Sequence, residues 1–405
     1  MAISISDALD LIYKKIDSVG VETIPMEESV GRVVALDYSA SCNLPRFDNS
    51  AMDGYAVRLN DNNKSVHCID TIYAGDKAEN ILRDGRCISI MTGAPIPDGC
   101  EAIVPKENTS MDNNLIKLPN DIKPNAHIRF EGEDIKKGEV FIQKSQKITP
   151  YTIALFASQG ITHISVYRKV NVAVFSTGDE LRPHYEKNIE HHLLYNSNAP
   201  MFISRALDLG CNTIHINTPC DTIESIKSSI SSALNADIII TSGGVSVGDK
   251  DFTKEAFFQM GMDIFFEKVD IKPGKPTTIG KIKDTIIINL PGNPLAGMVN
   301  FEMFIKPIIL LLQGDKNFYH GVIETKVDKT YNIKAGKYSV LLGKFDGFCF
   351  SILETQAPGM VSPLMEADAF MVTKPDTTQI NPSDTIKIVP IKMSFNSNIQ
   401  REFFM

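Results

Sequence analysis

The chain has 405 residues, more than a single hydrophobic core usually serves, so several domains are expected. Hydrophobic residues make up 43% and charged residues 22%, which is typical of a soluble globular protein. The net charge of −8, from 41 Lys plus Arg against 49 Asp plus Glu, excludes nucleic-acid binding through the overall field. An anionic ligand would therefore need a local basic cluster.

Cysteine usage and the N-terminus indicate a cytoplasmic protein. The seven cysteines are scattered and form no C-x-x-C pair, which argues against a disulfide framework or a zinc ribbon. The first residues lack the basic and apolar regions of a signal peptide. The most apolar stretch, 295–312, is interrupted by Asn300, Glu302, Lys306 and Pro307, so we do not expect it to span a membrane.

The chain begins with a predicted helix over about 6–19, which Ser6 would cap. Its apolar positions share one helical face: Ala8, Leu9, Ile12 and Ile16. Residues 46–57 then place two carboxylates, an amide, a hydroxyl and a glycine between apolar residues, which predicts an anchored acidic loop. From about 55 to 140, short apolar runs alternate with Gly and Pro turns, which predicts a separate β-rich domain.

From about 169 to 313, strand and helix patterns alternate. Strands are predicted at 170–175, 213–216, 237–241 and 285–290, and helices at 199–209 and from the D-x-x-E pattern of Asp221 and Glu224. This alternation predicts a doubly wound, mostly parallel α/β sheet, with ligands beyond the carboxyl ends of its strands. After Gly314 short strands return, which predicts a small terminal β domain, a barrel or a sandwich.

Two loops of this region favour an anion. Consecutive glycines in 241–251 could present backbone N–H groups to a phosphate, although a plain tight turn explains them equally well. This loop is neither a Walker loop nor a G-x-G-x-x-G fingerprint. Lys268, Lys272 and Lys275 lie within eight residues on a segment stiffened by prolines, which favours an anion site over a solvated turn.

Carboxylates occur in four separate loops, at Asp53, Asp134, Glu180 and Asp251. Each alone is best explained as a cap or a turn. If two or three converge, they could hold Mg²⁺ together with a substrate phosphate. The turn at 291–294 is explained by structure alone, although Gly292 would let a ligand approach the backbone.

Seven segments, in this order, resemble the molybdopterin molybdenumtransferase family, which includes bacterial MoeA and the gephyrin E domain. They are Asp48-Asn-Ser-Ala-Met-Asp-Gly-Tyr-Ala-Val57, Met91-Thr-Gly-Ala-Pro95, Gly132-Glu-Asp134, Ser176-Thr-Gly-Asp-Glu-Leu181, Ser242-Gly-Gly-Val-Ser-Val-Gly248, Lys272-Pro-Gly-Lys-Pro276 and Leu290-Pro-Gly-Asn-Pro294. The resemblance implies molybdenum insertion from molybdate into adenylylated molybdopterin, with release of AMP and assistance by Mg²⁺.

The resemblance also implies a multidomain α/β architecture. Its parts are an elongated N-terminal and linking domain (1–45 plus 140–168), an inserted β-rich domain (46–139), a central doubly wound, mostly parallel MogA-like α/β domain (169–315) and a C-terminal β-barrel-like domain (320–405).

Site residues follow from the matched motifs. The resemblance implies catalytic roles for Asp53, Thr92, Asp134, Glu180, Asp251, Lys268 and Lys272. It implies binding of the molybdopterin substrate by Arg129, Asp221, Ser242, Gly243, Gly244, Lys275, Pro291 and Pro294. Glu180 and Asp251 would hold the magnesium ion.

This chain departs from the family pattern at a few positions. Asn196 and Ala199 stand where the family has an acid and an arginine, and Pro358 lies in a segment that bears a serine in the family. The resemblance also implies a homodimer whose site is shared between subunits, and a separate molybdopterin adenylyltransferase protein as a partner. Two alternatives stay open, a non-catalytic scaffold of the gephyrin E-domain type and a molybdopterin adenylyltransferase.

Overall fold

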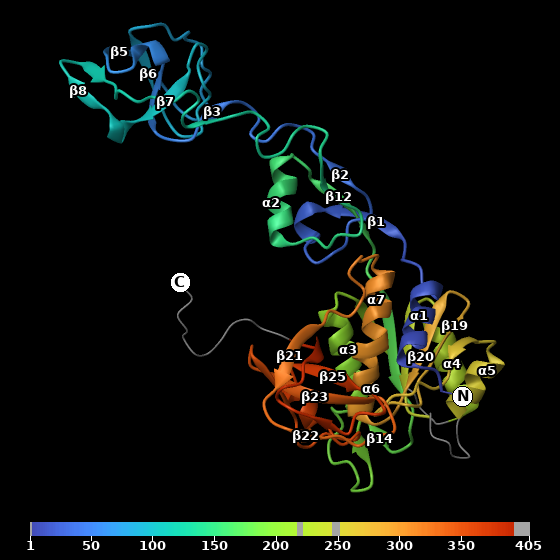
Figure 1. Cartoon of the computed structure of the whole chain (residues 1–405). Coiled ribbons are helices and arrows are strands. Elements are labelled where there is room, and N and C mark those ends of the chain that lie inside the picture. The colour runs from blue at the N-terminus through green and yellow to red at the C-terminus, as the bar shows by residue number, and fades with distance from the viewer. Residues whose placement is uncertain (1, 217–221, 245–251, 393–405) are drawn as a thin grey trace. The chain divides into compact units, whose positions relative to one another are not determined.

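The computed structural model describes residues 2–216, 222–244 and 252–392. The chain divides into two compact units. The first unit comprises Met1–Thr23, Gly31–Ala35 and Ser165–Met405, and the second comprises Ile24–Val30 and Leu36–Ile164. Figure 1 shows the elements of both units by label. The four finer domain boundaries stay predictions.

A six-stranded sheet forms the centre of the first unit, in the order β16-β13-β17-β20-β19-β18. Its strands are β13 (Asn171–Ser176), β16 (Asn212–His215), β17 (Ile238–Ser242), β18 (Asp263–Phe266), β19 (Thr278–Ile282) and β20 (Thr285–Leu290). The four strands β16, β13, β17 and β20 run parallel, whereas β19 pairs antiparallel with β20 and β18 pairs antiparallel with β19. The predicted parallel strands are confirmed, and the antiparallel edge was not predicted.

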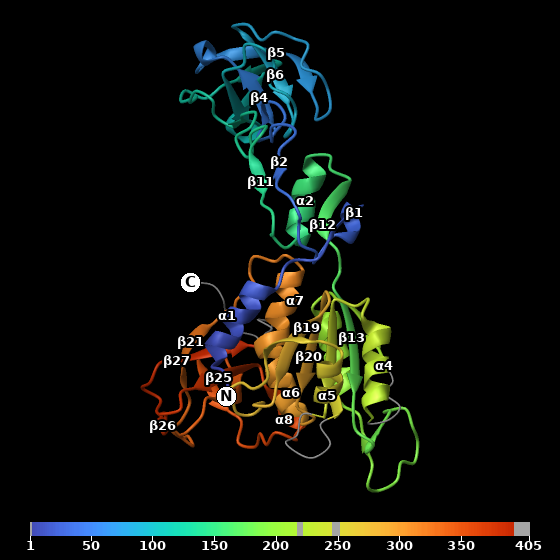
Figure 2. The ribbon, with the colours of Figure 1, turned by 90° about the vertical axis from the view of Figure 1, so that its right-hand side faces the viewer.

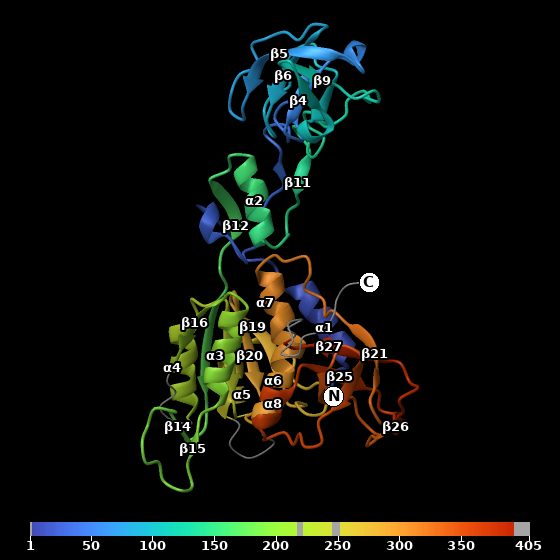
Figure 3. The same ribbon diagram turned by 90° about the vertical axis from the view of Figure 1, so that its left-hand side faces the viewer.

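Helices cover both faces of this sheet. Successive residues of a strand point to opposite faces, so each strand contributes side chains to the packing on both sides. On one face Val172 and Val174 pack in a core shared with α1 (Ile5–Lys15), α3 (Asn198–Asp208), α6 (Pro294–Asn300) and α7 (Lys306–Leu312). On the other face Ala173 and Phe175 pack against α4 (Ile223–Ala233) and α5 (Phe252–Gln259). Figures 2 and 3 view this layer from opposite sides. The doubly wound prediction is confirmed.

Two helix starts differ from the predictions. Helix α1 begins at Ile5, and Ser4 rather than Ser6 caps it by accepting a hydrogen bond from the Asp7 N–H at 3.0 Å. Helix α4 is capped by Thr222, whose hydroxyl accepts from the Ser225 N–H. The predicted cap Asp221 lies outside the described residues.

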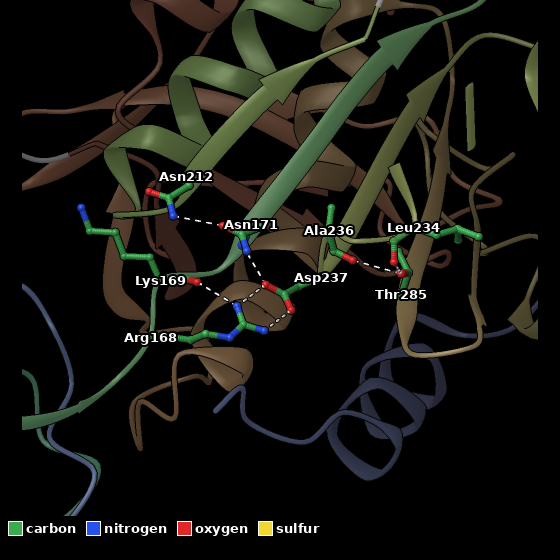
Figure 4. Close-up of polar contacts among 8 residues, drawn as sticks. All are labelled: Arg168, Lys169, Asn171, Asn212, Leu234, Ala236, Asp237 and Thr285. Carbon is green, nitrogen blue, oxygen red and sulfur yellow. Dashed lines mark hydrogen bonds and ion pairs between the residues drawn. The ribbon is translucent and has the colours of Figure 1, made fainter. Parts of the chain in front are cut away.

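An ion pair fastens the amino end of the sheet (Figure 4). Asp237, just before β17, accepts hydrogen bonds from both Nη atoms of Arg168, at 2.7 and 2.6 Å. The same carboxylate accepts the backbone N–H of Asn171 at 2.8 Å, at the first residue of β13. Because one carboxylate satisfies three donors, it joins the entry segment of β13 to β17.

Replacing this carboxylate is expected to destabilise the first unit. Asp237→Ala leaves Arg168 Nη2 and the Asn171 N–H without their acceptor, while Arg168 Nη1 keeps only Lys169 O, and we expect a loss of about 2 kcal/mol in the free energy of unfolding. Asp284→Ala is the control, because the pair of Asp284 with Lys281 is solvent-exposed and contributes at most about 1 kcal/mol. Urea unfolding measures both, and equal midpoints would contradict the prediction.

A continuous helical segment from Pro294 to Leu312 has the length and apolar composition of a membrane span, but 78% of it is buried inside the protein. Its central residues Phe301–Ile305 form a π-helical turn between α6 and α7. At that turn Glu302 is only 2% exposed and accepts a hydrogen bond from Arg205 Nε at 2.6 Å. The apolar residues of this segment thus belong to the core of the first unit.

The C-terminal region closes into a five-stranded barrel, β21-β24-β23-β25-β27. The strands are β21 (Ile323–Val327), β23 (Ser339–Phe345), β24 (Cys349–Ile352), β25 (Ala369–Thr373) and β27 (Ile386–Pro390). Alternating residues such as Phe350, Met371 and Ile388 fill its interior. This confirms the predicted terminal β-barrel domain.

The second unit contains a six-stranded sheet in the order β7-β4-β6-β5-β9-β8. Its strands are β4 (Gly54–Val57), β5 (Ser65–Ile72), β6 (Arg86–Ile90), β7 (Ala102–Pro105), β8 (Ser110–Asp112) and β9 (Leu115–Lys117). Two apolar clusters cover its faces, one around Ala56 and Ile88 and the other around Val57 and Cys87. These six strands confirm the predicted β-rich region. The same unit also holds helix α2 (Pro150–Ser158).

Candidate active site

Three parallel strands of the first unit end side by side and place their loops at one edge of the sheet. Ser176 of β13 is in register with Ser242 of β17, which is in register with Leu290 of β20. The loops that follow line a cavity of about 640 Å³. Its lining includes the predicted residues Glu180, Ser242, Gly243, Gly244, Pro291 and Pro294. The cavity therefore lies where ligands bind in open α/β sheets.

The glycines of this cavity allow the loops to pack closely. Gly243 has φ +99°, and a Cβ there would lie 2.4 Å from the Thr177 carbonyl oxygen. Gly244 has φ +64°, and a Cβ there would lie 2.2 Å from Thr253 Oγ1. Any larger residue would have to displace the neighbouring loop. The backbone itself thus forms this part of the cavity wall.

Glu180 is the one carboxylate among the described residues that line the cavity. Its side chain folds back over Gly178, because a Cβ at Gly178 would lie 2.7 Å from both of its carboxylate oxygens. Gly178 has φ +143°, a conformation that side-chain-bearing residues rarely adopt. The loop after β13 therefore holds a carboxylate against its own backbone at the cavity.

Polar residues that were not predicted support the same cavity. Asn198 is 6% exposed and donates from Nδ2 to the Gly292 carbonyl at 2.7 Å, which joins helix α3 to the loop after β20. Asn196 Oδ1 accepts the Ala199 N–H at 3.1 Å and so caps the start of α3. Thr177 lines the cavity as well. Thr177 directly follows β13 and Asn196 directly follows β15 (Leu194–Tyr195), a signal that could have identified these two, whereas Asn198 is the first residue of α3.

The departures from the family pattern thus have local structural roles. Asn196 retains the capping function that a carboxylate at this position would also perform. Pro358 accepts the Leu295 N–H through its carbonyl at 3.1 Å, and the adjacent Gly359 lines the cavity.

The lysine segment is an anchored turn beside this cavity. Val269 and Ile271 are buried, whereas Lys268, Lys272 and Lys275 are exposed. The turn is fixed because Gly274 O accepts hydrogen bonds from Thr277 Oγ1 at 2.9 Å and Asn300 Nδ2 at 3.0 Å. The lysines do not line the cavity, but Pro276 directly after them does. No described carboxylate forms an ion pair with any of the three ammonium groups.

Predicted residues of the second unit also come together. Asp53 Oδ1 accepts two hydrogen bonds from Thr92, one from its N–H and one from its hydroxyl, both at 2.8 Å. Arg129 pairs with Asn49 across strands β10 (Ile128–Arg129) and β3 (Asn49–Ser50). Asp134 donates its N–H to Leu44 O at 2.9 Å.

The acidic loop is anchored, but by hydrogen bonds rather than by the flanking apolar residues that the sequence predicted as anchors, because Phe47 is 47% and Met52 39% exposed. Ser50, which is fully buried, donates its backbone N–H to Ala94 O at 3.0 Å, in the segment of Thr92. Asp48 Oδ1 accepts the Glu131 N–H at 2.7 Å, in the segment of Asp134. These bonds bring the segments of Asp53, Thr92 and Asp134 together in the second unit.

The pKa of Asp53 is lowered from its ordinary value. The Thr92 N–H makes the largest contribution, the Thr92 hydroxyl the next, and the charge of Lys106 assists. All three favour the ionised carboxylate. Asp53 is exposed and therefore presents a permanent negative charge at neutral pH.

Removing the hydroxyl of Thr92 is expected to raise the pKa of Asp53 toward its ordinary value, because one of the two hydrogen bonds to the ionised form is lost. Thr92→Val keeps the size of the side chain and the backbone N–H. The acid limb of any activity that needs ionised Asp53 should then move to higher pH. Carboxyl-carbon NMR titration measures the pKa, and an unchanged value in Thr92→Val would contradict this cause.

Two predicted residues, Asp221 and Asp251, lie outside the described residues. Within 2–216, 222–244 and 252–392, no three His, Cys, Asp or Glu side chains cluster as a metal site. Glu180 alone is nevertheless compatible with Mg²⁺, which commonly binds one or two carboxylates together with substrate phosphates and water.

Comparisons with known proteins agree with this arrangement. The MoeA N-terminal region (domain I and II) matches residues 3–160, and the probable molybdopterin binding domain matches residues 173–310. A structure of the molybdopterin biosynthesis moeA protein from Pyrococcus horikoshii OT3 shares the fold, with a TM-score of 0.85, at 24% identity over 96% of this chain and 100% of that one.

Curated relatives are similar over most of their lengths. The molybdopterin molybdenumtransferase of Haemophilus influenzae is 34% identical over 388 residues, 91% of this chain and 93% of the relative. The protein of the same name from Staphylococcus epidermidis is 34% identical over 348 residues, 84% of this chain and 83% of the relative. The chain therefore belongs to the molybdopterin molybdenumtransferase family, a family of transferases in molybdenum cofactor biosynthesis.

Proposed function

We propose that this protein inserts molybdenum from molybdate into adenylylated molybdopterin and releases AMP. The observation that carries the proposal is the cavity at the carboxyl ends of β13, β17 and β20, with Glu180 and the glycine loop on its wall, in a chain of this family. Its volume of about 640 Å³ lies within the range of small-molecule sites.

The glycine loop supports binding of a phosphoanhydride. With no side chain at Gly243 or Gly244, backbone approaches the cavity directly. The Gly243 N–H donates to Leu290 O at 3.1 Å, so the Gly244 N–H is the one that would donate to a phosphate oxygen. Thr177 and Asn198 line the same cavity and supply polar groups of the kind that a pterin ring needs. The loops would orient the substrate before reaction.

The lysine turn supports molybdate binding. Molybdate is a tetrahedral dianion, and Lys268, Lys272 and Lys275 present three ammonium groups on a fixed backbone, none of them in an ion pair with a described carboxylate. In a protein of net charge −8 this local cluster is the feature that favours an anion. The lysines would also stabilise negative charge that develops when the anhydride is cleaved.

Mg²⁺ is proposed as the metal of this site, held by Glu180 and Asp251 together with substrate phosphate. Bound there, it would polarise the phosphoanhydride and so favour departure of AMP. Glu180 is already held at the cavity by its own loop. Glu180→Gln should raise the Mg²⁺ concentration needed for half-maximal turnover.

We also propose a homodimer in which each site combines the first unit of one subunit with the second unit of its partner. Asp53, Thr92, Arg129 and Asp134 belong to the second unit, whereas Glu180 and the lysines belong to the first. Isologous pairing of the two subunits would produce two equivalent sites. A cytoplasmic location and a separate adenylyltransferase that supplies the substrate are part of the same proposal.

The direct test supplies purified protein with adenylylated molybdopterin, molybdate and Mg²⁺ and measures AMP. We expect AMP release that depends on molybdate. ATP with unmodified molybdopterin should give no adenylylated product, and formation of that product would favour an adenylyltransferase. No AMP from folded wild-type protein, together with stoichiometric capture of another protein, would favour a scaffold.

A further inference from the structure

A second, smaller cavity of about 160 Å³ adjoins the main cavity, with which it shares the lining residues Leu181 and Asn196. Its cationic and imidazole residues are Arg182, His184 and His215. They come from β14 (Leu181–Arg182), the loop after it, and the end of β16. Figure 3 shows β14 at the lower end of the α/β layer.

This cavity has a basic lining, which is unusual in a protein of net charge −8. Its described lining includes no Asp or Glu side chain. Arg182 Nη1 donates to Asp179 O and Leu181 O, both at 2.8 Å, which fixes the guanidinium against its own loop. Its Nη2 and Nε have no hydrogen-bond acceptor among the described residues. The arginine therefore has donors free for a ligand.

The two imidazoles lie near enough to influence each other. The pKa of His215 is lowered first by burial and then by the charge of His184. Protonation of His215 is thus disfavoured, and an anion beside its ring would oppose that effect. Ser176 and Asn196 add polar groups to the lining.

The position and the volume of this cavity limit the kinds of ligand that it can bind. The cavity lies beyond the carboxyl ends of β13 and β16, the edge at which open α/β sheets bind ligands. A volume of 160 Å³ is below the range of about 300–1,000 Å³ that whole cofactors or drug-sized ligands occupy. It suits a single phosphate-sized group.

We propose that Arg182, His184 and His215 form an oxyanion subsite that binds a tetrahedral dianion, separate from the lysine turn. Its source is either a phosphate group of the substrate in the main cavity or free molybdate, and this assignment of the source rests on the proposed function. The sharing of Leu181 and Asn196 lets a phosphate here remain attached to a ligand in the main cavity.

The binding test uses inorganic phosphate, and separately molybdate, with the full-length protein and no other substrate. Histidine side-chain NMR reports this cavity, because the lysine turn contains no histidine. We expect saturable shifts of the His184 and His215 resonances, with the dissociation constant raised at least ~10-fold in Arg182→Gln. Arg83→Gln, which changes an exposed arginine of the second unit, is the matched control and should bind as wild type does.

The outcomes of the titration and of the turnover assay decide between these possibilities. Unaltered phosphate binding in folded Arg182→Gln, or no shift of either histidine in wild type, would overturn the subsite. In turnover, a raised KM for adenylylated molybdopterin in Arg182→Gln assigns the phosphate of the substrate, and a raised KM for molybdate assigns molybdate. Absence of turnover in wild type would remove the proposed function while leaving the phosphate titration as an independent result.

Discussion

Asp53→Asn and Glu180→Gln are each expected to lower turnover at least ~100-fold, and mixing the two variants is expected to restore activity. The two residues belong to different units of the chain. If each site combines units from two subunits, a mixed dimer contains one doubly altered site and one intact site. Random exchange of subunits would then restore about a quarter of wild-type activity.

This complementation experiment has a built-in control. A chain that carries both substitutions should restore nothing when it is mixed with either single variant, because neither mixed dimer contains an intact site. The variants should also unfold like wild type, since both side chains are exposed. Single variants that stay inactive after verified exchange of subunits would contradict a shared site.

Lys272→Ala and Lys275→Ala are expected to raise the molybdate concentration required for half-maximal turnover, by at least ~100-fold in the double variant. Two charge-assisted hydrogen bonds to a dianion would be lost, each of which contributes about 1.5–3 kcal/mol. The turn itself should persist, because Val269 and Ile271 stay buried and Gly274 keeps its hydrogen bonds.

Lys316→Ala is the matched control for the lysine prediction, because Lys316 is an exposed lysine of the same unit outside the turn. It removes one positive charge without altering the turn, so the molybdate requirement should be unchanged. Equal effects of Lys316→Ala and Lys272→Ala would show that net charge, rather than a site, governs molybdate binding.

Local sequence patterns were sufficient to predict the strands whose loops form the site. The run at 170–175 was predicted as a buried strand because it is apolar on both faces, and β13 packs in both cores. The predicted positions of Gly243, Gly244, Pro291 and Pro294 after strand ends placed them at one cavity. Because the parallel strands are in register, the loops that follow them lie at the same edge of the sheet.

Other features could not be predicted from the sequence, because they depend on contacts between distant residues or on a choice between two similar neighbouring residues. Ser4 and Ser6 both precede the apolar face of α1, and the periodicity does not tell which hydroxyl reaches an N–H group. The hydrogen bonds between Asp53 and Thr92 join residues 39 positions apart, which no local pattern encodes. The capping contact of Asn196 and the cation-lined cavity of Arg182 depend on tertiary packing in the same way.

The stoichiometry of molybdenum incorporation and AMP release tests the central claim most directly. Wild-type protein is incubated with adenylylated molybdopterin, Mg²⁺ and limiting molybdate in a single turnover, and both products are quantified together. We expect one molybdenum incorporated for each AMP released, and neither product in Glu180→Gln. Release of AMP without molybdenum incorporation, at the same rate with and without molybdate, would contradict the account.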